Sequence, residues 1–376
     1  MPRVLIVTGE ASGDLHGANL ARALTVAKPD IDLIGVGGPH MAAAGVPLLQ
    51  GLKRLDHMGL AGLSVLKTGY DNYKLIADYV QREPVDAVVL VDNSGMNLRL
   101  ARVAKGAGRR VIYYVAPQIW ASRPYRMRTI RQAVDLVLAI FPFEPALYAA
   151  AGVACTFVGH PLLDQVGTDY PVADLRRQFG LRADGPVIGL LPGSRLREVD
   201  MLLPPMLEAA ARLRDEFPAS QYVLAQASSI ARDVLDRYLA GTGLPVTVIE
   251  GQPSEVMAVA DVLMVASGTA TLQAAIVGTP MVLTYKTTWL TYQVARRVIT
   301  LKWIGLVNIL ANREVVPELI QYDATGARLH GSVGHLLRDT GAYEKMKQAL
   351  REVRVSLGAP GASARAAQAV LDCCTT

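Results

Sequence analysis

The fold is decided by residues 187–195, which read Val187-Ile188-Gly189-Leu190-Leu191-Pro192-Gly193-Ser194-Arg195. The apolar first half of this stretch predicts a strand buried on both faces, and its Gly-Ser turn precedes a helical pattern. Short apolar runs alternate with helical patterns along most of the chain, which indicates βα units. The sequence therefore predicts an α/β fold with parallel sheets.

The chain has 376 residues, which predicts two domains. Expected strands cover residues 4–7, 33–36, 87–91, 111–115, 136–140 and 155–158, then 187–191, 222–225, 246–249, 262–265 and 281–283. Turn and linker residues fill 161–186, and 308–321 reads as a loop followed by a helix. We expect Rossmann-like domains over 1–165 and 186–341, and a helical tail over 342–376 that crosses back to the first domain or packs on a partner.

The composition is that of a packed globular protein rather than a disordered one, with 51% hydrophobic and 19% charged residues. No apolar stretch reaches the roughly 20 residues that a spanning helix needs. The first residues read as a strand rather than a signal peptide. Cys155, Cys373 and Cys374 have no zinc-site spacing and suggest a reducing compartment. The net charge of +5 fits nucleic acid, a phosphorylated substrate, an anionic membrane or an ordinary surface.

Candidate ligand-binding residues follow the first-half strands, because ligands bind beyond the carboxyl ends of parallel strands. Gly9, Glu10, Ser12 and Gly13 precede a helix, where backbone amides suit an anion or a sugar hydroxyl. A tight turn is the alternative. Neither G-x-G-x-x-G nor G-x-x-x-x-G-K-[ST] is present, which argues against an NAD-dependent oxidoreductase.

Asp92 ends an expected strand and is a candidate general base, with helix capping as the alternative. Asp86 lies at the opposite end of the same strand, so geometry makes it less suited to contact a substrate. Trp120 precedes a cluster of arginines that could grip phosphate, although a solvated basic helix with a core Trp would look the same. The cluster consists of Arg123, Arg126, Arg128 and Arg131.

Two strand–turn–helix junctions in the second half predict a diphosphate cradle. The first carries Gly193, Ser194 and Arg195, with Glu198 one turn on to anchor the arginine. The second runs Ser267-Gly268-Thr269-Ala270-Thr271. Backbone amides and a guanidinium are good donors to phosphate oxygens. Core packing does not explain why both junctions combine Ser with Gly.

Taken together, these segments resemble the lipid-A-disaccharide synthase family. The matching stretches are GEASGDLHG from Gly9, PFE from Pro142, GHPLLD from Gly159, LLPGSR with Glu198, SGTATL from Ser267, NILANRE from Asn308 and PELIQ from Pro317. The resemblance implies an inverting glycosyltransferase of the GT-B architecture, two Rossmann-like domains with a cleft between them. It implies transfer of 2,3-diacylglucosamine from UDP-2,3-diacylglucosamine to 2,3-diacylglucosamine 1-phosphate, giving UDP and a β-1,6-linked disaccharide.

The resemblance also implies roles for individual residues. Catalysis would fall to Asp92 and Asp86, and membrane or acyl contact to Met58, Leu60 and Leu63. The loops that face donor and acceptor would comprise Gly9, Glu10, Ser12, Gly13, Asn97 and Arg123. UDP-sugar would bind to Gly193, Ser194, Arg195, Ser267, Gly268, Thr269, Ala270, Gln273 and Asn308. Neither a metal nor a cofactor is implied. The expected location is the cytoplasmic face of the inner membrane, with a homodimer possible and no nucleic acid partner.

The chain departs from the family pattern at ligand-facing positions. Ser94 stands for Pro, Met96 for Phe, Ser122 for Trp, Gly62 for Glu and Gln273 for Glu. GT-B enzymes commonly use that last Glu to accept ribose hydroxyl protons, so an uncharged Gln should weaken binding by about 1–2 kcal/mol. The departures leave open a divergent transferase, an enzyme like UDP-N-acetylglucosamine 2-epimerase, and a non-catalytic nucleotide-binding paralogue.

Overall fold

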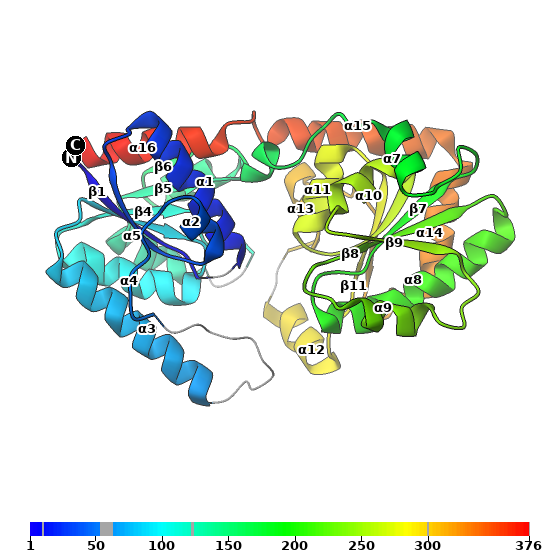
Figure 1. Ribbon diagram of the computed structural model, residues 1–376, viewed down its shortest axis with the longest axis horizontal. Helices are drawn as coiled ribbons and strands as arrows, with labels where there is room; N and C mark the ends of the chain where they lie inside the picture. Colours follow the sequence, from blue (N-terminus) through cyan, green and yellow to red (C-terminus); the bar gives the residue numbers. More distant parts are fainter. Residues whose placement is uncertain (10, 53–62, 122–123, 299–300, 376) are drawn as a thin grey trace. The chain divides into compact units, whose positions relative to one another are not determined.

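The computed structural model describes residues 1–9, 11–52, 63–121, 124–298 and 301–375. The chain forms two compact units, each with its own sheet (Figure 1). Unit 1 comprises Met1–Asp164 and Leu357–Thr376, and unit 2 comprises Gln165–Ser356. The C-terminal tail therefore divides between them: α15 (Thr340–Ser356) belongs to unit 2 and α16 (Ala362–Thr375) to unit 1.

Unit 1 contains a six-stranded parallel sheet in the order β2-β1-β3-β4-β5-β6. Its strands are β1 (Arg3–Val7), β2 (Asp32–Val36), β3 (Ala87–Val91), β4 (Arg110–Tyr114), β5 (Leu136–Ala139) and β6 (Cys155–Phe157). All six lie within a residue of the stretches expected from the sequence. The strands are nearly all apolar because helices cover both faces of the sheet.

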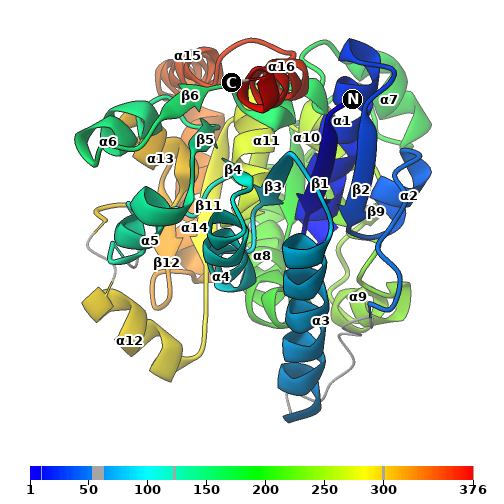
Figure 2. The same ribbon diagram turned by 90° about the vertical axis from the view of Figure 1, so that its left-hand side faces the viewer.

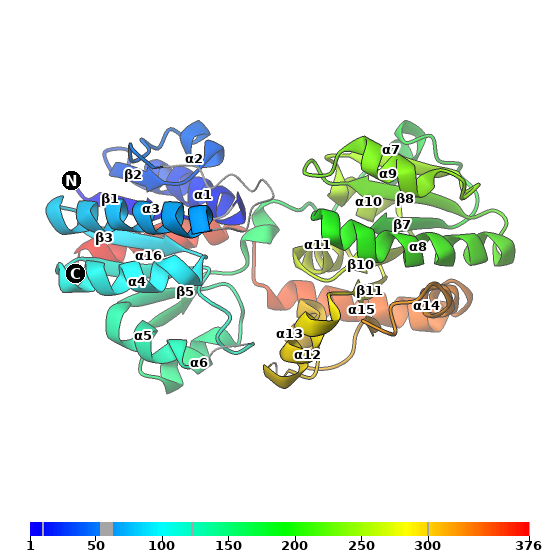
Figure 3. The ribbon, with the colours of Figure 1, turned by 90° about the horizontal axis from the view of Figure 1, so that it is seen from below.

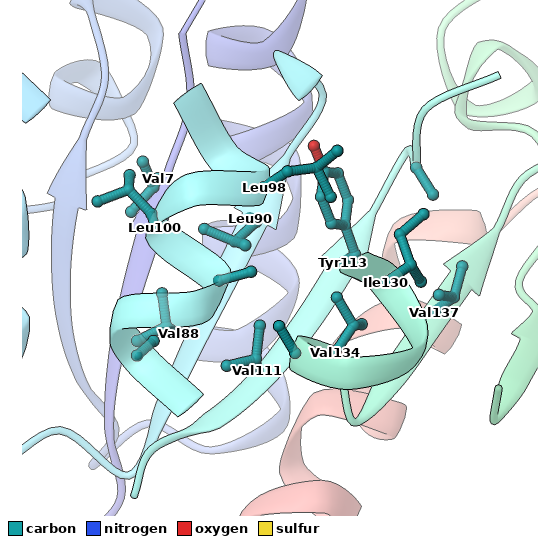
Figure 4. Packing of buried hydrophobic residues seen from close by; sticks show 14 of the residues in the cluster. Val7, Val88, Leu90, Leu98, Leu100, Val111, Tyr113, Ile130, Val134 and Val137 are labelled. Carbon is teal, nitrogen blue, oxygen red and sulfur yellow. The ribbon is translucent and has the colours of Figure 1, made fainter. Parts of the chain in front are cut away.

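The two helical layers of unit 1 come from distant parts of the chain. On one face α1 (Ala11–Ala27) packs on α16, and on the other α3 (Leu63–Arg82) packs on α4 (Ser94–Gly106), which packs on α5 (Arg126–Ala133) (Figures 1 and 3). The remaining helices are α2 (Pro39–Ala43), α6 (Glu144–Ala150) and the 3₁₀ turn η1 (Pro161–Asp164). Figure 4 shows the apolar core beneath α4 and α5, where Leu90, Leu98, Tyr113, Ile130 and Val137 are buried.

Hydrogen bonds from the last helix to Asp164 fix it on unit 1. The Asp164 carboxylate accepts from the backbone amides of Gly361, Ala362 and Ser363, which are the free donors at the start of α16. The His160 amide donates to the carbonyl of Leu357 at 2.9 Å. These contacts explain why the sequence breaks its helical tail at Gly358, Pro360 and Gly361.

Unit 2 repeats the architecture with a parallel sheet in the order β12-β11-β10-β7-β8-β9. Its strands are β7 (Val187–Leu191), β8 (Gln221–Gln226), β9 (Val246–Glu250), β10 (Val262–Ala266), β11 (Met281–Tyr285) and β12 (Glu318–Ile320). One face carries α7 (Val172–Gln178), α10 (Pro253–Val259), α11 (Thr269–Val277), α13 (Leu306–Ala311) and α15, and the other carries α8 (Leu196–Glu216), α9 (Arg232–Leu239) and α14 (Gly326–Arg338). One further helix, α12 (Trp289–Val298), lies between β11 and α13 in sequence.

The segment 308–321 was wrongly expected to be a loop followed by a helix. Residues 306–311 form α13 instead, and Glu318–Ile320 form β12, which pairs in parallel with β11. The buried Asn308 side chain explains the turn between them: its oxygen accepts from the amides of Val315 and Val316, and its nitrogen donates to the Val316 carbonyl. A three-residue strand carries too little apolar pattern for periodicity to identify it.

Candidate active site

The strand order of unit 1 puts a topological switch point at the carboxyl ends of β1 and β3. The chain runs from β1 to β2 on one side of it and then crosses back to β3 on the other side. The connections after β1 and β3 therefore leave the sheet in opposite directions. Gly9 follows β1, Ser12 and Gly13 lie in the first turn of α1 rather than ahead of it, and β3 runs into Asp92. Two segments singled out in the sequence thus meet at the switch point of this sheet.

Asp92 is the ionisable group at this switch point. Its side chain is half-buried, and burial raises the pKa of its carboxyl above the ordinary value. Hydrogen bonds from the Asn93 amide and the Ser12 side chain act in the opposite direction, because both stabilise the charged form. A partly desolvated carboxylate held by an amide and a hydroxyl is a suitable proton acceptor.

The backbone around Asp92 is strained and firmly held. Asp92 and Asn93 adopt φ of +52° and +36°, and Val115, which follows β4, adopts +54°. Such conformations cost about 1–3 kcal/mol each and collect at functional sites. The Asp92 carbonyl accepts from the Tyr113 hydroxyl at 2.7 Å and from Asn97 Nδ2 at 2.9 Å. Asn97 is fully buried, so it holds this backbone rather than facing a ligand.

Gly9 is required by a close approach. A Cβ at residue 9 would lie 1.8 Å from Asn93 Nδ2, so only glycine lets the loops after β1 and β3 pack together. Asp14 lies on α1 beyond this loop and is buried. Its carboxylate accepts from the amides of Gly38, His40 and Met41, which ties the loop after β2 to α1.

Asp86 lies at the other end of β3. It is exposed there, and its carboxylate accepts the Arg3 amide at 2.7 Å. Five strand residues, Ala87–Val91, separate it from Asp92, which puts the Cα atoms of the two aspartates about 20 Å apart at about 3.3 Å per residue. The two aspartates therefore do not act on the same atom.

An aromatic cluster follows β4 and β5 in unit 1. Trp120 packs edge-on against Phe141 and Phe143, with ring centroids 5.9 and 5.1 Å apart. The buried Glu144 carboxylate accepts Trp120 Nε1 and the amides of Ile140 and Phe141. The PFE motif therefore fixes the indole, while Arg126 of the predicted cluster donates to the Ser94 hydroxyl.

Two histidines of unit 1, the half-buried His16 and the buried His160, carry no charge at neutral pH. Burial lowers the pKa of His16 to about 4, and burial together with the nearby His16 lowers the pKa of His160 to about 3. Neither can therefore serve as a cation for a phosphate. Across the described residues there is no group of three or more His, Cys, Asp or Glu side chains that could hold a metal ion.

Unit 2 holds a cavity of about 550 Å³ at its own switch point, between β7 and β10. This volume lies within the range of about 300–1,000 Å³ that small-molecule sites occupy. Both predicted junctions line it. The predicted residues in its wall are Gly193, Ser194, Arg195, Ser267, Gly268, Thr269, Ala270 and Gln273.

The two junctions offer different donors to this cavity. Glu198 accepts the backbone amides of Ser194 and Arg195 at 3.0 and 3.2 Å, and Arg195 Nη1 at 3.0 Å. Those two amides are therefore already paired with a carboxylate of the chain itself. At the other junction the residue that precedes α11 is Gly268, which has no side chain to cap the first amides of the helix, and the Thr271 amide donates to the Gly268 carbonyl. The start of α11 is thus the better anion site. Arg195 forms an ion pair with Glu198 at the first junction, and most of the arginine side chain is exposed.

Asn308 does not line the cavity. It is fully buried, and Nδ2 also donates to Glu318 Oε1 at 2.9 Å. Sequence reasoning missed the part of the wall that follows β8 and β9. These residues are Ala225, Gln226, Ala227, Ser228, Gly251, Pro253 and Met257. The same rule about carboxyl ends of strands would have found them, but they carry no Ser-Gly signature.

Some predicted residues lie outside the described part of the chain. These are Glu10, Met58, Leu60 and Arg123, together with the departures Gly62 and Ser122. Leu63 begins α3, but its side chain is also outside the description. No helix in the described residues is both long enough and apolar enough to cross a membrane.

Comparison with known proteins gives consistent results. A family model described as lipid-A-disaccharide synthetase matches residues 4–372. The lipid-A-disaccharide synthase of Geobacter metallireducens is 41% identical over 371 residues, covering 98% of this chain and 97% of the relative. That of Myxococcus xanthus is 40% identical over 372 residues, covering 99% and 97%.

Solved structures resemble the chain in fold. A UDP-GlcNAc 2-epimerase from Neisseria meningitidis bound to UDP-GlcNAc gives a TM-score of 0.68 at 13% identity, covering 98% of this chain and all of that one. A glycosyltransferase from Rickettsia africae gives 0.62 at 11% identity, covering 100% and 99%. These likenesses support the expected two-domain architecture of glycosyltransferases and epimerases.

Glycine at position 193 should be essential for the geometry of the first junction. Gly193 has φ +114°, and a Cβ there would lie 2.4 Å from Glu198 Oε2. Gly193→Ala should displace Glu198 and release the amides of Ser194 and Arg195. Their hydrogen exchange should accelerate on the order of tenfold, the equivalent of about one hydrogen bond.

The matched control is Gly241→Ala, which shares a positive φ (+78°) but meets no atom within 4 Å. It should leave the exchange of residues 194 and 195 unchanged. Equal exchange in all three proteins would mean that Glu198 does not protect these amides.

Proposed function

We propose a function from one premise, that the chain belongs to the lipid-A-disaccharide synthetase family. The protein is a glycosyltransferase of lipid A biosynthesis, which joins a sugar from a nucleotide-sugar donor to a lipid acceptor. The proposed donor is UDP-2,3-diacylglucosamine and the proposed acceptor is 2,3-diacylglucosamine 1-phosphate. The products are then UDP and lipid A disaccharide 1-phosphate.

The observation that carries this assignment is the cavity of unit 2, whose wall joins the two strand–turn–helix junctions. In our proposal the UDP diphosphate lies at the start of α11, where backbone amides and the helix dipole attract anions. Arg195 adds a cation for the charge that develops as UDP leaves. Glu198 positions Arg195 through their 3.0 Å contact, and Asn308 shapes the neighbouring turn from within the core.

Asp92 is the proposed general base. Removal of the proton from the 6-hydroxyl of the acceptor lets that oxygen attack the anomeric carbon opposite the departing UDP, which inverts the configuration. A half-buried carboxylate with a raised pKa supports this role. We assign Asp86 a structural role, because it lies at the amino end of β3 and accepts the Arg3 amide.

Membrane association is also part of the proposal. Both substrates carry acyl chains, so the enzyme is proposed to work peripherally at the cytoplasmic surface of the inner membrane. Met58, Leu60 and Leu63 are proposed acyl or membrane contacts of unit 1.

The direct test is release of UDP from UDP-2,3-diacylglucosamine with and without the acceptor, with mass analysis of the lipids. Release that depends on the acceptor, with formation of the disaccharide, is the expected result. Asp92→Asn should lower kcat by about 10²–10⁴-fold, and Arg195→Ala by about 10²–10³-fold. The matched variant Asp86→Asn should retain wild-type turnover. Acceptor-independent conversion of the donor would indicate an epimerase-like reaction instead.

The pH dependence of kcat/KM should identify the base. Asp92 acts only when ionised, so activity should fall as the pH drops through its pKa. Because burial raises that pKa, the acid limb should lie above the range of an exposed Asp, about pH 4.

Ser12→Ala removes a hydrogen bond that lowers the pKa of Asp92, so the limb should move to higher pH. Ser94→Ala is the matched control, since its hydroxyl faces Arg126 instead. A limb that stays in place in Ser12→Ala would contradict the assignment.

Gln273 is proposed to accept a ribose hydroxyl without a charge. Gln273→Glu should therefore tighten UDP binding about tenfold, since hydrogen bonds to an ionised acceptor are roughly twice as strong. Isothermal titration with UDP and with 2′,3′-dideoxy-UDP separates a contact with the ribose hydroxyls from an effect elsewhere in the site. The gain should vanish with the dideoxy nucleotide, and a gain that persists would place the new carboxylate away from the ribose.

A further inference from the structure

Helix α12 is the least supported helix of unit 2. Within the described chain it makes no extensive contact with another helix or strand, whereas α11 and α13 both pack on α15. Figures 2 and 3 show it at the edge of the unit. At 10 residues it is shorter than the roughly 12–15 residues below which isolated helices are marginal in water. Something that covers its outer face would therefore stabilise it.

The outer face of α12 combines large apolar side chains with arginines. Trp289 and Leu290 are 62% and 68% exposed, unusually high for such residues. Arg296 and Arg297 are also exposed. Arg296 follows Trp289, and Arg297 follows Leu290, by about two helical turns. Each apolar side chain therefore shares a face of the helix with an arginine.

The surroundings of α12 continue this pattern. Tyr292 packs edge-on against Tyr322, which is 65% exposed. Lys302 lies over the ring of Trp303, 4.7 Å from its centroid. From residue 286 to residue 313 the sequence contains no Asp or Glu. Its basic residues in that span are Lys286, Arg296, Arg297, Lys302 and Arg313.

We propose that α12 is an interfacial helix that docks unit 2 on a bilayer surface rich in anionic phospholipid. Trp and Tyr side chains favour the boundary between head groups and acyl chains, and Lys and Arg bind anionic head groups. A helix of this length lies in the plane of the interface, since a spanning helix needs roughly 20 residues. The unbroken positive charge favours an anionic surface over an apolar protein groove. This inference deepens the proposed membrane location, and it assigns a contact to the donor-binding unit.

Co-sedimentation of the full chain with vesicles tests the proposal. Vesicles of phosphatidylcholine mixed with phosphatidylglycerol should bind the protein, more weakly at high salt, and vesicles of phosphatidylcholine alone should bind it less. Trp289→Ser with Leu290→Ser should weaken binding to both kinds of vesicle. Arg296→Gln with Arg297→Gln should weaken binding to the anionic vesicles by roughly tenfold to thirtyfold, at about one factor of five per charge.

The controls remove exposed charges or an exposed apolar side chain elsewhere in unit 2. Arg232→Gln with Arg237→Gln on α9 removes as many exposed charges, and Val355→Ser on α15 removes an exposed apolar side chain. Both should bind anionic vesicles like the wild type. Wild-type binding by both α12 variants, or equal losses in the controls, would overturn the proposal. Self-association lost only in the α12 variants would instead identify a second copy of the chain as the occupant.

A separate assay distinguishes failure of this inference from failure of the proposed reaction. On substrates dispersed in detergent, the α12 variants should release UDP at the wild-type rate, because no bilayer has to be reached. Absence of UDP release from the wild type would count against the proposed reaction and leave the vesicle result standing.

Discussion

Both units depend on the same constraint, the point at which a parallel sheet reverses its strand order. The segments after the two central strands lead to helices on opposite faces of the sheet there, so residues from both segments can line one site at the carboxyl ends of the strands. In unit 1 this brings Ser12 to Asp92, and in unit 2 it joins Gly193–Arg195 to the start of α11 in one cavity. The sites therefore follow from chain order, and side chains refine them.

The two switch points are held in different ways. Around Asp92 the backbone takes two consecutive left-handed residues, a strain of about 1–3 kcal/mol each. Hydrogen bonds from Tyr113 and Asn97 and the tight fit of Gly9 against Asn93 offset that strain and fix the carboxyl. In unit 2 the first junction is held by one side chain, because Glu198 pairs with two amides and a guanidinium. A neutral, packed scaffold suits a base, whereas an exposed ion pair suits a site that must receive an anion.

The sequence predicts the strands and the junctions well because both depend on local patterns. Ala87–Val91 and Val187–Leu191 are predicted to the residue, since fully buried parallel strands read as unbroken apolar runs. Long-range pairing is what local patterns miss. The local sequence around Asn308 does not indicate that its side-chain amide bonds to residues 315, 316 and 318. Strand β12 is likewise defined by its pairing with β11 and not by a local pattern. Likewise the sequence gives no sign that Glu198 already occupies the amides of Ser194 and Arg195.

The departure at Gln273 has to be weighed against the charge of the whole cavity. Arg195 lines it as a cation, and Glu198 already places one carboxylate next to the proposed diphosphate site. A second carboxylate at 273 would strengthen contacts with ribose hydroxyls but would add repulsion toward the diphosphate, which an exposed cavity screens only in part. Gln273 removes that repulsion at the cost of a weaker hydroxyl contact. The direct hydroxyl contact outweighs the more distant, solvent-screened repulsion, so Gln273 weakens the donor site without abolishing it.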